Sequence, residues 1–408
     1  MTIYLGILLI ILILYIIIQK SVNLMEPGVL FCIIILTTYF LATLRLSSLQ
    51  SVYPLWFTLL ILAMIAIFYL GCRTVNVFSI SDAEIQTYDP FRMRCIIFVL
   101  WTLILFGFLM TVRTLGAPPA ISGTERADYF VSGWGSIVLL QTTLAALLLF
   151  DRYNQKSVGG MYWIYMASIV ILTALYANKF QIIYLLVLIL VARNSYGKKI
   201  KIKNLLLLAL AIILLFVILF QFVYQNMYGV TMKDMYIGYY MNIPYKFNFI
   251  TQPYLYLAYN YENLYHYLIS SPHHLYGYKT LYGFIDSFHL EGLVPANILA
   301  YIDEWKNLLK VPSLTTGTMF EDFAQDGSIP LMFILTYLAG VWSAFCYRKF
   351  QKNKNFIWFF LYAASVVAIF FSFFSNAFTS KVTLINIFAS LVIGWVLHTR
   401  FLYHGKEI

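Results

Sequence analysis

The chain has 408 residues, of which 62% are hydrophobic and only 11% are charged, and its mean hydropathy is +0.80. Soluble domains are about 45–50% apolar and about 25% charged, so this composition excludes a water-soluble globular protein. The formal charge of +10 would favour a nucleic-acid partner in a soluble protein. In a membrane protein it is typical of Lys and Arg gathered on the cytoplasmic side.

Continuous apolar runs of helix length recur along the chain, which disfavours a transmembrane barrel with its alternating strands. A helix that crosses a bilayer needs about 20 mostly apolar residues. The sequence therefore predicts an all-α polytopic membrane protein, a single integral membrane domain over residues 1–408. Its eleven predicted transmembrane helices are 3–18, 27–46, 52–72, 95–112, 134–150, 161–177, 180–195, 204–224, 328–347, 355–374 and 379–398.

The distribution of basic residues predicts the orientation. The first apolar run precedes its first basic residue, Lys20, which is typical of an uncleaved anchor with its N-terminus outside. In that orientation 17 of the 27 Lys and Arg fall in six short cytoplasmic segments. The positive-inside rule holds best for short segments, so we expect the N-terminus outside and the C-terminus in the cytoplasm.

Residues 225–327, between the eighth and ninth predicted spans, form a large, partly helical loop on the outer side in this topology. The loop holds 15 of the 33 tyrosines, and spacings of three and four over 254–268 predict an amphipathic helix along the membrane surface. Two interpretations of the tyrosines stay open. They form an aromatic belt at the bilayer interface, or they form a platform on which sugar rings stack.

Basic residues on the predicted outer face are candidates for anion binding. Arg113 and Arg126 lie in the loop 113–133, and Lys179 lies in the tight turn between the sixth and seventh spans. A basic side chain at membrane depth usually meets an anion or an internal partner, and the Arg fork suits a diphosphate. The alternative is snorkelling to lipid headgroups, which we favour for Arg113.

Acidic residues gather in the sequence TTGTMFEDFAQDG, residues 315–327, which leads directly into the ninth span. On a helix Asp322 and Asp326 stand one turn apart on one face, as do Glu321 and Gln325. A carboxylate with a tuned pKa at the membrane boundary can deprotonate a sugar hydroxyl. Glu321, Asp322 and Asp326 are therefore the candidate catalytic residues.

Two simpler functions compete for these acids. Thr318 fits a helix N-cap with Glu321 three residues later, which explains Glu321 but not Asp326. Paired carboxylates also bind divalent cations, but two or three acids without other ligands are weak evidence for a metal, and we expect no metal site.

The predicted arrangement of spans with one large outer loop, together with three motifs, resembles that of the Wzy-type polymerases. These enzymes join lipid-linked oligosaccharide repeat units of O-antigen, capsule or exopolysaccharide. The stretch TTGTMFEDFAQDGSIPLMFILTYLAG (315–340) is similar to the family's pattern of Thr, an aromatic-acidic stretch, Gly, and a membrane helix closing in Gly. The turn ANKFQIIYLLVLILVAR (177–193) resembles its basic residue opening an apolar helix. PYLYLAYNYENLYHYLISSPHHLYGYKT (253–280) resembles its aromatic stretch before a Gly-containing turn.

The resemblance implies a GT-C-like, membrane-embedded glycosyltransferase of the bacterial inner membrane. It implies that the growing chain moves from undecaprenyl diphosphate onto a new lipid-linked unit by an inverting reaction, with no cofactor, metal or nucleotide sugar. It implies lipid-linked repeat units and membrane lipids as binding partners, a chain-length regulator and a flippase as partner proteins, and no nucleic acid.

The resemblance also places the substrate-binding residues. Arg126 and Lys179 match the family's cationic sites and would stabilise the departing diphosphate. The large loop lacks the Arg that family members often carry, so Lys279, Lys306 or Lys310 would replace it as a point charge. The candidate substrate-binding residues are Arg126, Lys179, Arg113, Lys279, Tyr256, Tyr259 and Tyr278.

Three other functions stay open. A lipid-oligosaccharide flippase or other transporter usually carries internal repeats and broken helices, and we find no repeat pairing between the halves. A ligase that attaches finished glycan to a different acceptor would share the lipid donor and the architecture. A scaffold subunit of an assembly complex would need none of the charged outer residues.

Overall fold

The computed structural model describes residues 2–18, 23–75, 88–124, 128–197, 229–270, 273–311 and 314–398, single positions 200, 203, 207, 210, 211, 214 and 217, and the pairs 402–403 and 406–407. The chain forms two compact units. Unit 1 consists of Met1–Ser79, Ile200–Phe345 and Ser365–Lys381, and unit 2 of Ile80–Lys199, Cys346–Ala364 and Val382–Ile408.

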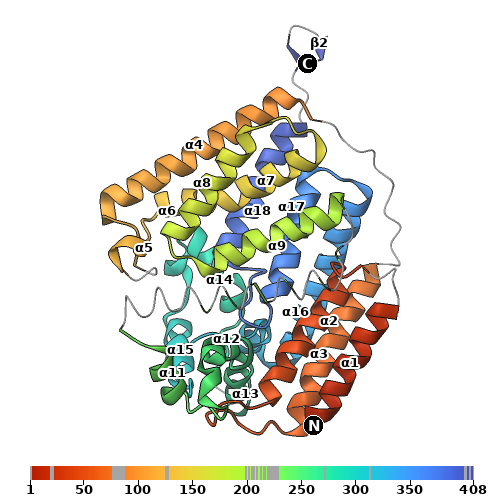
Figure 1. Ribbon diagram of the computed structural model, residues 1–408, viewed down its shortest axis with the longest axis vertical. Helices are drawn as coiled ribbons and strands as arrows, with labels where there is room; N and C mark the ends of the chain where they lie inside the picture. The colour runs from red at the N-terminus through yellow and green to blue at the C-terminus, as the bar shows by residue number, and fades with distance from the viewer. Residues whose placement is uncertain are drawn as a thin grey trace. The chain divides into compact units, whose positions relative to one another are not determined.

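The described residues are almost entirely helical, as Figure 1 shows. The elements in chain order are α1 (Thr2–Ile18), α2 (Pro27–Thr43), α3 (Leu55–Thr74), α4 (Pro90–Leu115), α5 (Pro119–Ser122), α6 (Trp134–Leu139), α7 (Gln141–Asn154), α8 (Met161–Leu175), α9 (Lys179–Tyr196), α11 (Met232–Gly238), η2 (Tyr245–Ile250), α12 (Thr251–Ala258), α13 (Asn260–Ser270), α14 (Tyr278–Ser287), η3 (Glu291–Leu293), α15 (Ala296–Asn307), α16 (Met319–Lys352), α17 (Phe356–Phe371), α18 (Lys381–His398), β1 (Leu402–Tyr403) and β2 (Lys406–Glu407). The two short strands pair antiparallel.

Within the described residues, five helical segments are long and apolar enough to cross a membrane: Leu55–Thr74, Pro90–Ser122, Trp134–Asn154, Met319–Lys352 and Lys381–His398. Five shorter apolar helices are Thr2–Leu12, Pro27–Thr43, Met161–Leu175, Phe180–Tyr196 and Phe356–Phe371. Each lies on a predicted span, which confirms the helical membrane protein. The remaining predicted span, 204–224, lies mostly outside the described residues, and the count of eleven, the orientation and the GT-C-like fold stay predictions.

In unit 1 the helix α2 packs against α1 and α3, and α12 and α13 pack on α2. Figure 1 shows α1, α2 and α3 next to one another. The Tyr261 hydroxyl of α13 lies 2.8 Å from the Thr38 hydroxyl of α2, and the Tyr261 ring meets the Tyr39 ring edge-on at 5.1 Å. The predicted helix over 254–268 is thus present, interrupted at Tyr259. Its tyrosine face is covered by protein, so the prediction that this face lies along the membrane surface is wrong.

The helices α3 and α16 cross at a pair of glycines in unit 1. A Cβ atom on Gly71 would lie 2.3 Å from the carbonyl oxygen of Tyr337, and one on Gly340 would lie 2.3 Å from that of Phe68. The Cys72 thiol contacts the Gly340 carbonyl oxygen at 3.3 Å. Small residues allow this close approach of backbones, which is a common way for membrane helices to associate.

This crossing gives a first prediction. Gly340→Val places side-chain atoms against backbone that cannot rotate away, and we expect it to lower the free energy of unfolding by about 1–3 kcal/mol, the usual cost of overpacking. Gly160→Val is the matched control, because a Cβ there has no heavy atom within 4 Å. Thermal unfolding in detergent measures both variants, and equal melting temperatures would contradict the prediction.

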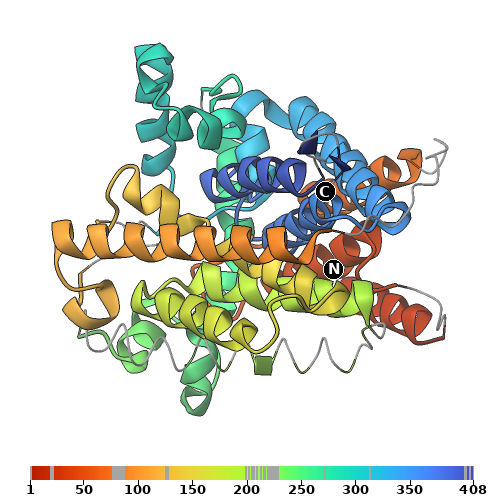
Figure 2. The same cartoon turned by 90° about the horizontal axis from the view of Figure 1, so that it is seen from above.

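In unit 2 the long helix α4 packs along α6 and α7, and α7 packs against α8 and α9. Figure 2 shows α4 in orange along its whole length. Asn386 of α18 accepts hydrogen bonds from the backbone N–H (3.0 Å) and the hydroxyl (2.7 Å) of Thr143 in α7. This pair satisfies buried polar groups on two apolar helices, as a low-dielectric interior favours.

Candidate functional site

The acidic segment begins α16 in unit 1. The Thr318 hydroxyl accepts the backbone N–H of Glu321 at 3.3 Å, which confirms the predicted N-cap. The helix is interrupted at Gly327 and Ser328, whose backbone angles are not helical. The uncharged stretch 328–347, long enough to span a bilayer, follows that break. The three candidate acids precede both the break and this uncharged stretch.

Glu321 is buried, with 1% of its surface exposed. Its Oε1 accepts hydrogen bonds from Trp305 Nε1 at 2.8 Å and from Gln325 Nε2 at 3.3 Å. Its Oε2 has no partner among the described residues. Burial and the neighbouring charge of Asp322 raise the pKa of Glu321 to about 8, so the carboxyl holds its proton at neutral pH.

A glycine makes room for that carboxyl. A Cβ atom on Gly317 would lie only 1.9 Å from Glu321 Oε2, so a larger residue would displace the acid. The absence of a side chain at Gly317 therefore leaves the space that the Glu321 carboxyl occupies.

Asp322 is the accessible acid of the three. Its side chain is 30% exposed, and its Oδ1 lies 3.9 Å from Nζ of Lys279, which is 22% exposed. The Lys279 ammonium also lies 4.7 Å from the centre of the Trp305 ring, within cation–π range. Burial raises the pKa of Asp322 to about 6, although Lys279 opposes the shift and Asp326 adds to it. A carboxylate with this pKa is ionised at neutral pH but is a better base than an ordinary Asp.

Asp326 has a different role. It is 1% exposed, and its two oxygens accept the backbone N–H groups of Lys279 at 2.8 Å and Thr280 at 2.7 Å. It thereby caps the first turn of α14, whose N-terminal N–H groups have no partner within the helix. With both oxygens engaged by the backbone, Asp326 positions Lys279 and does not act as a base. We therefore remove it from the candidate catalytic residues.

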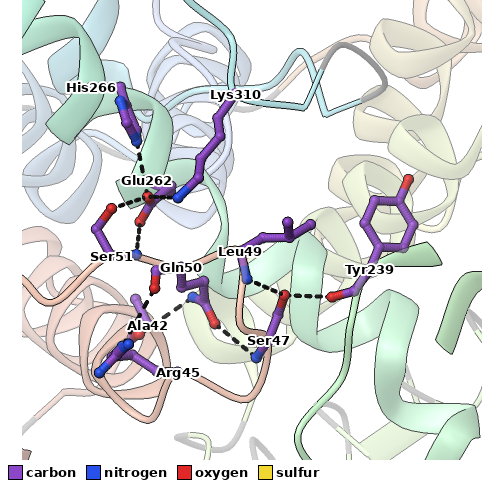
Figure 3. A network of polar contacts seen from close by, with 10 residues as sticks. All are labelled: Ala42, Arg45, Ser47, Leu49, Gln50, Ser51, Tyr239, Glu262, His266 and Lys310. Atoms are coloured by element: carbon purple, nitrogen blue, oxygen red, sulfur yellow. Dashed lines mark hydrogen bonds and ion pairs between the residues drawn. The ribbon is translucent and has the colours of Figure 1, made fainter. Parts of the chain in front are cut away.

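A second polar cluster holds α13 to the loop between α2 and α3 (Figure 3). Glu262 of α13 is fully buried and accepts hydrogen bonds from the backbone N–H of Ser51 at 2.9 Å and from the Ser51 hydroxyl. His266 Nε2 and Lys310 Nζ lie 3.1 and 3.3 Å from its Oε1. Burial raises the pKa of Glu262, but the hydrogen bonds and the Lys310 charge outweigh it and hold the pKa below its ordinary value.

The next residues of α13 hold the loop that leads into the acidic segment. Asn263 Nδ2 donates to the carbonyl oxygens of Leu314 and Thr316, each at 2.7 Å. The Thr316 hydroxyl donates to Asn260 Oδ1 at 2.6 Å. The Glu262 cluster therefore fixes α13, and α13 fixes the loop that places Glu321 and Asp322.

The candidate tyrosines do not form an open platform. Tyr259 and Tyr278 are 1% and 8% exposed, which leaves no ring face for a sugar. Tyr256 is half-buried, and its ring stacks on Phe374 with centres 5.4 Å apart. The prediction of sugar stacking is wrong for Tyr259 and Tyr278, because their side chains belong to the packed interior of unit 1.

Two candidate cations that precede residues 225–327 in the sequence, Arg113 and Lys179, belong to unit 2. Arg113 is exposed in the last turn of α4. Lys179 is the first residue of α9, which Asn178 caps by accepting the Gln181 backbone N–H at 3.1 Å. Arg126 lies outside the described residues. Their diphosphate-binding role therefore stays a prediction, whereas Lys279 is placed beside Asp322.

Sequence reasoning missed two residues that shape the cluster, Trp305 and Gly317. The Trp305 indole N–H donates a hydrogen bond to Glu321, and the Lys279 ammonium lies over the Trp305 ring. It is also the only tryptophan in residues 225–327, a signal that could have drawn attention to it.

Comparisons of the chain with protein-family models, with curated proteins and with solved structures find no match. The cluster at the start of α16 combines the buried protonated carboxyl of Glu321, the half-exposed carboxyl of Asp322 and the ammonium group of Lys279.

Proposed function

We propose that the protein is a membrane-embedded glycosyltransferase that joins polyprenyl-diphosphate-linked oligosaccharides into a polysaccharide. The observation that carries the proposal is the Asp322–Lys279 pair, a half-exposed base and a cation 3.9 Å apart where α16 approaches its membrane-spanning stretch. A reaction between lipid-linked sugars must take place at this boundary, because the diphosphate is polar and its polyprenyl chain is not.

The pair supplies the two groups that such a transfer needs. Asp322 accepts the proton of the attacking sugar hydroxyl, whose oxygen forms a bond to the anomeric carbon of the donor. The bond from that carbon to the diphosphate breaks, and its electron pair leaves on a phosphate oxygen. The Lys279 ammonium stabilises this growing negative charge.

Glu321 and Trp305 support the pair without reacting. Glu321 stays protonated, so it adds no second negative charge beside Asp322. Trp305 donates to Glu321 and holds the Lys279 ammonium over its ring, which limits where both groups lie. This preorganisation keeps the base and the cation in place before the substrates arrive.

The proposal is tested by reconstituting the full chain in vesicles with a polyprenyl-diphosphate oligosaccharide as its only substrate. We expect a ladder of products that grow by one repeat unit, with release of one polyprenyl diphosphate for each new linkage. Heat-inactivated protein in matched vesicles is the control.

Each competing function predicts a different product. A flippase would move the substrate across the bilayer without lengthening it, and a ligase would transfer glycan only when a different acceptor is added. A scaffold subunit would give no product with either acceptor. Any of these results would contradict the polymerase proposal.

A further inference from the structure

The helix α14 has two unlike faces. Lys279, Gly283 and Asp286 recur at intervals of four and three residues and therefore share one face of the helix. Leu281, Phe284 and Phe288, at intervals of three and four, share the opposite face, Phe288 lying just beyond the last helical residue. The first face contacts other parts of unit 1. The side chains on the second face are largely exposed among the described residues.

The held face is fixed at three points in unit 1. The first turn of α14 is capped by Asp326. In the middle, Gly283 packs so closely that a Cβ would lie 1.9 Å from the carbonyl oxygen of Thr379. Near the end, Asp286 Oδ2 lies 3.0 Å from Nζ of Lys381. The direction in which α14 turns its other face is therefore defined.

That other face is apolar and exposed. Leu281, Phe284 and Phe288 are 54%, 48% and 60% exposed, and the rings of Phe284 and Phe288 lie 4.7 Å apart. Leu293, in the short helix η3 that follows, is 79% exposed. Water-exposed patches of this kind are unfavourable unless a membrane or a partner covers them.

The anchors of α14 indicate which environment surrounds this face. Asp326 stands directly before the uncharged stretch 328–347, and Lys381 is the first residue of α18, another helix able to cross a membrane. The stretch 328–347 and the helix α18 therefore both begin beside α14. This position places α14 at the depth where hydrocarbon meets headgroups. Amphipathic helices lie in this region with the apolar face in the acyl chains.

We infer that α14 is an interfacial helix whose Leu281, Phe284 and Phe288 side chains lie in the hydrocarbon of the bilayer, on the side where α16 and α18 begin. The occupant of the face is lipid. Because Lys279 lies on the opposite face of the same helix, the polar cluster is then only one helix diameter from the acyl chains.

The inference is tested with the full chain in phosphatidylethanolamine–phosphatidylglycerol vesicles. Cys32, Cys72, Cys95 and Cys346 are replaced by alanine, and a nitroxide is attached to a single new cysteine at Leu281→Cys, Phe284→Cys or Phe288→Cys. Collision of the nitroxide with oxygen, which concentrates in hydrocarbon, is compared with collision with a water-soluble nickel chelate. Asn297→Cys, at an exposed polar position of α15, is the matched control.

We expect a higher oxygen-to-nickel collision ratio at all three α14 positions than at Asn297. A ratio at those positions equal to that of Asn297 would place the face in water and overturn the inference. Low collision with both reagents, together with an immobilised nitroxide, would show a covering protein and would overturn it as well. The measurement needs no activity, so its result is separate from that of the polymerase proposal.

Discussion

Replacing Asp322 by Asn is expected to lower the rate of polymer formation by about 10²–10⁴-fold, the usual contribution of a general base. The amide has nearly the size of the carboxylate but cannot accept a proton at neutral pH. Asp322 is 30% exposed, so the fold should tolerate the change. The measurement is the ladder of products in reconstituted vesicles, where the unchanged single repeat unit should accumulate.

Variants of two other acids, Glu321 and Glu304, distinguish a loss of catalysis at Asp322 from a change in packing. Glu321→Gln imitates the protonated form that burial favours, so this variant should keep most of the activity. Glu304→Gln changes an exposed acid that pairs with His273, and this variant should keep the activity of the natural protein. If Asp322→Asn is as active as Glu304→Gln, then Asp322 is not the base.

The pH profile gives an independent check of the same group. A base must be ionised, and the pKa of Asp322 is raised to about 6. The polymerisation rate should therefore rise with pH through about 6 and then level off. The residual activity of Asp322→Asn should lack this rise, because the amide does not titrate in that range.

Continuous apolar runs were sufficient to predict the helices. The run 95–112 lies inside α4 and the run 328–347 inside α16, because helix length and apolar character are local properties of a sequence. Thr318 as the N-cap was predictable for the same reason. The burial of the tyrosine face on α2 was not, because spacing identifies a helix face but not what covers it.

The functions of the acids depended on distant partners. Asp322 and Asp326 were predicted to share a helix face, yet Asp326 caps α14 while Asp322 meets the Lys279 side chain. The spacing of four residues cannot reveal this difference, since it arises from where residues 277–280 pack. Glu262 was not singled out at all, because Ser51 and Lys310 are its partners only in the folded chain.

Replacing Glu262 by Ala is expected to lower the free energy of unfolding by about 1–3 kcal/mol, the usual cost of leaving shielded hydrogen-bond donors without their acceptor. The change leaves the Ser51 backbone N–H and hydroxyl without their acceptor and opens a space beside Lys310 (Figure 3). Denaturant unfolding in detergent measures the loss. Glu304→Ala is the control, and its exposed pair with His273 should contribute about 0–1 kcal/mol.

The same carboxylate should make stability depend on pH. The pKa of Glu262 is lower in the folded protein than its ordinary value of 4.5, so its contribution is fully present above that pH. As the pH falls below 4.5, the unfolded chain takes up the proton first and this contribution is progressively lost. We therefore expect the difference in unfolding free energy between the natural protein and Glu262→Ala to shrink with acidification. A difference that stays constant from pH 7 to about pH 3 would show that the hydrogen bonds to Glu262 do not stabilise its ionised form.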